Sequence, residues 1–150
     1  MGYDNEKALQ QAILKDMQST LDRTVIKMVE KLKDFIQENL YDVYDPLWYE
    51  RTMQVLNLWM AQPSVITGNS VTSTISPDYN TLKTNRSKNQ HIVTGETLIN
   101  MLISGYGTQT QPYNMPRDFW SPYIEWVNQN FDRIFQQEFG KANATTFINL

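Results

Sequence analysis

The only histidine of the chain, His91, lies five residues before Glu96, and these two side chains are the ones best suited to acid–base chemistry. A histidine and a carboxylate can move a proton only where they meet beside a substrate in a cleft. The simpler interpretation is a histidine at a strand edge, followed by a helix whose N-terminal end is complemented by Glu96. We therefore expect no catalytic residue and no enzymatic activity, with a small hydrolase using this pair as the alternative.

The sequence gives equally little support for a metal site or a cofactor site. The chain has no cysteine, and its carboxylates are not spaced as they are in known metal sites. Gly105-Tyr106-Gly107 lacks the third glycine and the strand-to-helix context of a dinucleotide loop. It indicates instead the end of a helix and the start of a loop. We expect neither a metal nor a cofactor.

Three bases, Lys83, Arg86 and Lys88, lie in a stretch that contains no acid between Asp78 and Glu96. No aromatic residue alternates with them, as it would in a protein that stacks single-stranded bases. Two interpretations stay open: a solvated loop, or a loop that contacts a partner. We take the three bases as candidate interface residues, and we expect residues 80–90 to order only on assembly, because they offer little apolar area to bury.

Length and composition favour one soluble domain, residues 1–150. Hydrophobic residues make up 41% and charged residues 19%, and the net charge is −3. A mildly acidic chain is not built to grip DNA phosphates. The four Trp, eight Tyr and six Phe favour either a dense core or a buried partner surface. The absence of cysteine suits a reducing cytoplasm, and neither a secretory signal nor a membrane span is expected.

A long amphipathic helix is predicted over residues 5–40. Its apolar stripe has the spacing of one helical face and runs through Leu14, Met17, Leu21, Val25, Met28, Leu32, Phe35 and Asn39, widened by Val29, Ile36 and Leu40. Such a helix would be roughly 50 Å long, whereas a domain of this size is about 40 Å across. It must therefore break, as the capping-box pattern of residues 19–22 allows, or project against another subunit. We favour continuity, with Leu14 and Met17 as candidate interface residues.

The remaining elements complete an α+β fold. A second helix is predicted from Asp45 to Ala61, because Asp45 and Pro46 form a helix start. Further predictions are a small antiparallel hairpin (residues 64–67 and 71–75) around Gly68-Asn69, short strands at 79–83 and 91–93, a short helix from Thr94 to Gly105, a loop over 105–116, and a C-terminal amphipathic helix. The last helix is expected to start at Ser121-Pro122, or one turn earlier, and to end at Gly140.

Residues 44–60 resemble a segment of the tail-completion, or head–tail joining, family of siphophages, whose members are often described as minor capsid or neck proteins. The residues that carry the resemblance are Tyr49, Arg51, Thr52 and Leu56. Residues 118–135 are also similar to the C-terminal helix of some relatives from Gram-positive hosts. Residues 98–108 depart from the segment that many relatives carry after the hairpin. Arg51, beside Glu50 and near Asp45, is expected to be structural.

The resemblance implies a structural virion protein that forms an oligomeric ring, six- or twelve-fold, at the head–tail junction. Its implied partners are the connector or adaptor on the head side and the tail tube or tail terminator on the other. DNA would pass through without specific binding, and the protein would be made in the host cytoplasm. The alternative is a small cytoplasmic helical adaptor that binds a protein partner through its N-terminal amphipathic helix.

Overall fold

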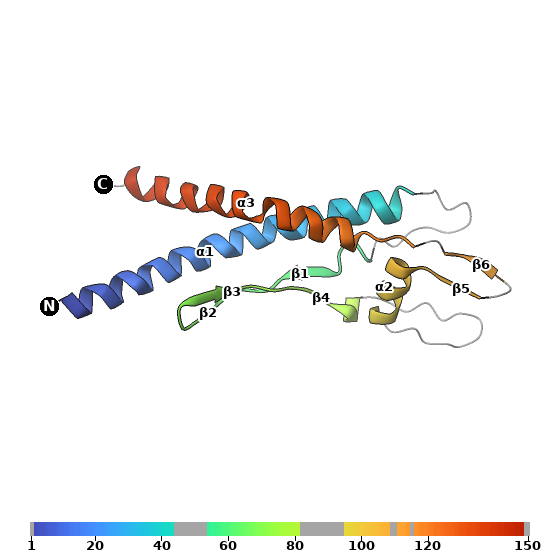
Figure 1. Ribbon diagram of the computed structural model, residues 1–150, viewed down its shortest axis with the longest axis horizontal. Helices are drawn as coiled ribbons and strands as arrows, with labels where there is room; N and C mark the ends of the chain where they lie inside the picture. Colours follow the sequence, from blue (N-terminus) through green and yellow to red (C-terminus); the bar gives the residue numbers. More distant parts are fainter. Residues whose placement is uncertain (1, 44–53, 82–94, 109–110, 115, 149–150) are drawn as a thin grey trace. The chain divides into compact units, whose positions relative to one another are not determined.

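The computed structural model describes residues 2–43, 54–81, 95–108, 111–114 and 116–148, with side chains at 5–43, 54–80, 95–105 and 116–141. The elements are drawn in Figure 1, and in chain order they are α1 (Gly2–Ile36), the π-helical turn η1 (Gln37–Tyr41), β1 (Trp59–Ala61), β2 (Val65–Thr67), β3 (Ser70–Thr72), β4 (Ile75–Pro77), the 3-10 helix η2 (Tyr79–Thr81), α2 (Gly95–Ser104), β5 (Tyr106–Thr108), β6 (Gln111–Asn114) and α3 (Trp120–Ile148). The fold is α+β and mostly helical, as the sequence predicts.

The chain divides into two compact units. The first unit comprises Met1–Val29, Ala61–Ser76 and Val127–Leu150, and the second comprises Glu30–Met60 and Pro77–Trp126. The single domain expected from the length of the chain stays a prediction.

Helix α1 runs without interruption for 35 residues, or about 52 Å. The predicted stripe is its buried face, with Leu32 and Ile36 fully covered. The break considered at residues 19–22 is wrong. Thr20 donates its hydroxyl hydrogen bond back to the Asp16 carbonyl (2.7 Å), and Thr24 does the same to Thr20 (2.8 Å). Both threonines are fully buried, so their hydroxyls are satisfied inside the helix instead of capping a new one.

The predicted hairpin is confirmed. Strands β2 and β3 are antiparallel, and the register pairs Val65 with Thr72 and Thr67 with Ser70. Gly68 in the turn has a φ of +59°, a conformation that glycine adopts without steric cost. The hairpin belongs to the first unit, where its turn reaches helix α1.

The predicted second helix is wrong over its described part. Residues 54–57 form a turn that contains Leu56, and strand β1 follows at Trp59–Ala61. Strand β1 pairs with β4. Its flanking backbone groups are used in the same ladder, since Asp78 donates its N–H to the Leu58 carbonyl at 2.9 Å. Sheet pairing therefore overrides the helical spacing of the apolar residues. The predicted helix start at Asp45 lies outside the described residues.

Two further predictions fail around helix α2. Residues 105–116 are not simply a loop, because β5 and β6 form an antiparallel hairpin in which Tyr106 pairs with Asn114. Residues 79–81 form the 3-10 helix η2 instead of a strand. In both places, short polar segments gain backbone hydrogen bonds locally, without an apolar pattern that would reveal them. Helix α2 and its end at Gly105, which has a φ of +74°, are confirmed.

Helix α3 begins at Trp120, and its capping side chain is Asp118, not Ser121. The Asp118 carboxylate accepts the N–H groups of Trp120 (3.0 Å) and Ser121 (2.9 Å). The Ser121 hydroxyl bonds to the same carboxylate and lowers the pKa of Asp118, with the two backbone N–H bonds adding to the effect. The expected end at Gly140 is also wrong, because α3 continues to Ile148. A glycine inside a helix is tolerated at a cost of about 1 kcal/mol.

An aromatic cluster forms part of the core of the second unit. Trp59 stacks on Trp120 with ring centroids 5.2 Å apart, and it meets the edge of Phe119 at 6.3 Å. Tyr123 lies 5.6 Å from Trp120 and 6.0 Å from Phe35. Burial raises the pKa of Tyr123 to about 12. Its hydroxyl and the Trp59 Nε1 are buried without a hydrogen-bond partner among the residues that the structure describes.

Candidate interaction surface on helix α1

The structure describes only part of the predicted site. Leu14 is buried, with 9% of its surface exposed, and Met17 is half-buried on the same face. Leu56 is half-buried in its turn, and Glu96 is exposed in the first turn of α2. Their roles in binding stay predictions. The other residues singled out from the sequence, namely Lys83, Arg86, Lys88, Tyr49, Arg51, Thr52 and His91, lie outside the described residues.

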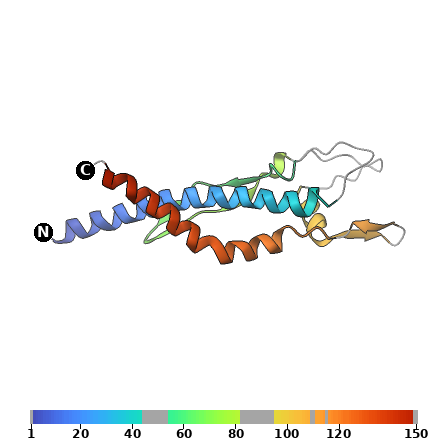
Figure 2. The ribbon, with the colours of Figure 1, turned by 90° about the horizontal axis from the view of Figure 1, so that it is seen from above.

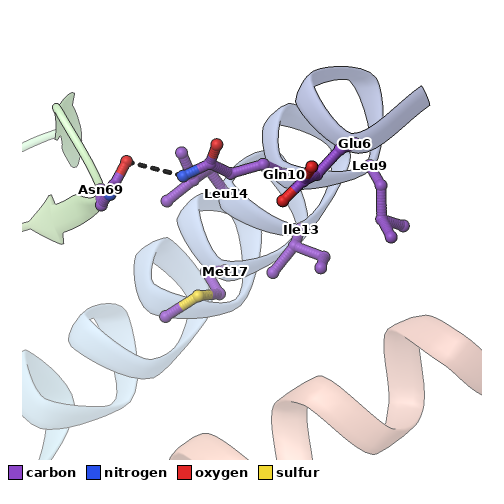
Figure 3. Close-up of a pocket in the computed structure, with 7 residues that line it drawn as sticks. All are labelled: Glu6, Leu9, Gln10, Ile13, Leu14, Met17 and Asn69. Carbon is purple, nitrogen blue, oxygen red and sulfur yellow. Dashed lines mark hydrogen bonds between the residues drawn. The ribbon is translucent and has the colours of Figure 1, made fainter. Parts of the chain in front are cut away.

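A hollow lies along the first turns of α1, within the first unit. It has a volume of about 370 Å³ and is lined by Glu6, Leu9, Gln10, Ile13, Leu14, Met17 and Asn69. Figure 3 shows Leu9, Ile13 and Met17 following one another along the helix, while Gln10 turns toward Asn69 of the hairpin. Leu9 is 62% exposed and Ile13 is 48% exposed. Large apolar side chains that are grouped and exposed in this way mark a binding surface.

A second hollow in the same unit continues this surface. It has a volume of about 310 Å³ and is lined by Met17, Leu21, Val71, Phe131, Asp132 and Phe135, from α1, β3 and α3. Phe131 and Phe135 stack with their ring centroids 5.9 Å apart. Because Met17 lines both hollows, they form one apolar surface. We call the lining residues of the two hollows together the α1 surface.

The hairpin is fixed against α1 at Ser64. The Asp22 carboxylate accepts the backbone N–H of Ser64 at 2.8 Å. The Gln18 amide donates to the Ser64 carbonyl at 2.7 Å, and the Ser64 hydroxyl donates to the Gln18 carbonyl at 3.2 Å. Nearer the N-terminus, the Gln10 amide donates to the Asn69 side chain at 2.7 Å. These bonds hold β2 and β3 beside the helix and so fix one wall of the α1 surface.

Helix α3 is fixed to α1 by a buried carboxylate. Glu138 is only 4% exposed, and its side chain receives hydrogen bonds from Lys27 and Lys141, the latter at 3.2 Å. Arg23 Nε lies 3.6 Å from the second carboxylate oxygen. The hydrogen bond from Lys27 is the largest cause that lowers the pKa of Glu138. In the view of Figure 2, the C-terminal part of α3 passes across the N-terminal half of α1.

Sequence reasoning did not identify the Glu138 cluster or the exposed pair Leu9 and Ile13. A signal for the cluster exists, because Glu138 occupies the apolar stripe of α3 by spacing while Arg23 and Lys27 are one turn apart on α1. A charged residue on a buried face requires a partner. Leu9 and Ile13 are also one turn apart, but nothing in the sequence distinguishes an exposed apolar face from a buried one.

The α1 surface is suited to binding and not to chemistry. It offers apolar side chains, two carboxylates and two amides, without a nucleophile beside a base. Within the described part of the chain, no group of three or more histidine, cysteine, aspartate or glutamate residues is placed to hold a metal ion. Among the same residues, no helix combines the length and apolarity needed to cross a bilayer.

Comparison with known proteins identifies a family. No curated protein and no solved structure matches the chain. The profile of the YomN family matches residues 5–141, which include the whole of the α1 surface and the Glu138 cluster. The chain therefore belongs to the YomN family, a phage-associated protein family.

Proposed function

We propose that the protein is a structural component of a long-tailed phage that joins the head to the tail. The observation that carries the proposal is the exposure of Leu9 and Ile13 beside a hollow on the first turns of α1, in a chain that belongs to a phage-associated family. A protein that works alone in solution gains nothing from such a face, whereas a subunit of a particle buries it on a neighbour.

The resemblance to head–tail joining proteins supports the same proposal. It rests on Tyr49, Arg51, Thr52 and Leu56 and on residues 118–135. The order of a long N-terminal helix, a small hairpin and a long C-terminal helix also agrees with that family's order of elements, although residues 54–61 form a turn and strand β1 where the family has an apolar helix. We propose that copies of the protein form a closed, symmetric ring at the junction, six- or twelve-fold as the resemblance implies.

In this role the protein contacts the connector or adaptor of the head and the tail tube or tail terminator. DNA passes through the ring without specific binding, because a net charge of −3 lets the polyanion slide instead of holding it. The protein needs no catalytic residue and no cofactor. It is synthesised in the host cytoplasm and ends in the virion at the head–tail junction.

Disruption of the gene in a phage that encodes it tests the proposal. The expected lysate contains DNA-filled heads and complete tails that are not attached to each other, as seen by electron microscopy. The wild-type gene supplied on a plasmid should restore joined, infectious particles. Joined particles in the absence of the protein, or loss of heads or tails themselves, would exclude a joining role.

A cytoplasmic adaptor that binds one protein through α1 is the second candidate. The same exposed Leu9 and Ile13 favour it, because an amphipathic helix can dock in a groove of a partner. The two candidate functions predict different locations for the protein after the particles have assembled. An adaptor would stay in the lysate supernatant after purification of the particles, whereas a joining protein would sediment with them at a fixed copy number.

A further inference from the structure

We infer that the α1 surface binds a segment of another protein whose apolar side chains are flanked by lysine or arginine. The inference deepens the proposed function by giving the chemistry of the partner. It rests on that function only for placing the partner in the same phage particle. The shape and the charge of the surface carry the inference separately.

The shape of the α1 surface fits an amphipathic helix. The lining residues on α1 extend from Glu6 to Leu21, which is about 22 Å along the helix axis. A partner helix of about four turns spans the same length. Its apolar side chains would follow one another at helical spacing, as Leu9, Ile13 and Met17 do (Figure 3). The two hollows would each accept part of that row.

The charge of the α1 surface selects a basic partner. Glu6 lines the first hollow and Asp132 lines the second, so each hollow has a carboxylate. Among the described residues that line the two hollows, none is a lysine or an arginine. A bound segment with acidic flanks would place like charges together, whereas basic flanks give complementary potentials that orient the partner and speed its association.

The same argument excludes two other occupants. A second copy that presented the same face would bring its own Glu6 and Asp132 into the contact, and no lysine or arginine from the described lining of its two hollows. Such a symmetric contact is disfavoured by like-charge repulsion, which adds to the cost of desolvating the carboxylates. A nucleic acid would bring phosphates against the same carboxylates. The partner is therefore a protein segment that is apolar on one face and basic at the edges of that face.

Binding of designed peptides to the purified full-length protein tests the inference. The first peptide is a helix of about four turns with leucines at helical spacing and flanking lysines. The second replaces each lysine by glutamate, and the third scrambles the first. Fluorescence anisotropy of labelled peptides at low and physiological salt gives the affinities. We expect the lysine peptide to bind at least about tenfold more tightly than the other two, with a smaller margin at higher salt.

Variants of the protein test whether the peptides bind at the α1 surface. Replacement of both exposed side chains, Leu9→Ser with Ile13→Ser, should weaken binding of the lysine peptide by at least about tenfold. The matched control is Ile26→Ser, since Ile26 is 52% exposed on the same helix and lines neither hollow. The double charge reversal Glu6→Lys with Asp132→Lys should make the glutamate peptide the tighter ligand. Circular dichroism checks that each variant is folded.

Three results would overturn the inference. They are equal affinity for the lysine and glutamate peptides, an unchanged preference after the charge reversal, and self-association of the protein that the Leu9→Ser, Ile13→Ser variant abolishes. The last result would place a second copy on the surface. None of these results bears on the attachment of heads to tails, so the joining role and the chemistry of the partner can fail independently.

Discussion

Lys27 on helix α1 donates a hydrogen bond to the carboxylate of Glu138 on helix α3, which is almost completely buried. The two residues are 111 positions apart in the sequence, and the bond joins the two long helices within the first unit. Lys27, Arg23 and Lys141 have side-chain exposures of 42%, 38% and 68%. Glu138 is thus the buried member of the cluster, and the bases reach it from the surface.

Glu138→Gln should lower the free energy of unfolding. The amide keeps the shape of the carboxylate but loses the charge-assisted bonds, and we expect a loss of about 1–3 kcal/mol. The bases are partly exposed and can turn to water, which keeps the loss below that of a fully buried pair. Urea unfolding followed by circular dichroism measures the change. Glu30→Gln, at an exposed site on α1, is the control and should change stability by less than about 0.5 kcal/mol.

The contribution of Glu138 should disappear in acid. Its pKa is lowered in the folded protein from the ordinary value of 4.5. The unfolded chain therefore takes up this proton first, and the stabilisation is fully present above pH 4.5 and is lost as the pH falls through the folded pKa. The difference in stability between the wild-type protein and Glu138→Gln should narrow below pH 4.5. A difference that stays constant down to the acid transition would show that the ionised carboxylate contributes nothing.

Tyr123→Phe should leave the stability unchanged or raise it. Within the described part of the chain, the buried Tyr123 hydroxyl has no hydrogen-bond partner. Its removal therefore spares a desolvation cost while the aromatic contacts stay. The pKa is raised from 10.0 to about 12, so the unfolded chain ionises first and the wild-type protein should lose stability between these pH values. The variant should lose less over that range. A marked loss at neutral pH would show that the hydroxyl has a partner.

Gly140→Ala should stabilise the protein by about 0.5–1 kcal/mol. Gly140 lies inside helix α3, and a Cβ built there meets nothing within 4 Å, so alanine restricts the unfolded chain without strain. Gly68→Ala is the contrasting variant. It also has open space but holds a φ of +59°, and it should be destabilising. Thermal unfolding of both variants checks the pair, and a loss of stability in Gly140→Ala would indicate that α3 ends near residue 140.

Elements with a strong local signal were predictable from the sequence, and elements without one were not. The stripe of α1 has the period of a helix, and the β2–β3 hairpin has a glycine at a turn position that requires positive φ. Trp59 and Met60 fit a helix by spacing, yet they belong to strand β1, because the backbone of β1 pairs with that of β4. Pairing of distant segments is decided by tertiary contacts that no local window contains.

The candidate site shows the same limit. The stripe on α1 was evident, and the role of Leu14 at an interface stays a prediction. Leu14 is largely buried in the structure, and the large apolar side chains exposed beside it are Leu9 and Ile13. Which apolar residues of a helix stay exposed depends on where the hairpin and α3 end, and that is a property of the whole unit. The Glu138 cluster likewise needs α1 and α3 to be placed together before its charges can be paired.

The position of the protein in the intact particle tests the central claim most directly. A virion that carries an epitope-tagged copy can be labelled with gold-conjugated antibody and imaged by electron microscopy, with the untagged virion as the control. The proposed role predicts gold at the junction between head and tail, in nearly every labelled particle. Gold along the tail, on the head surface or at the tail tip, or a tagged protein that is absent from purified virions, would contradict a role in joining head and tail.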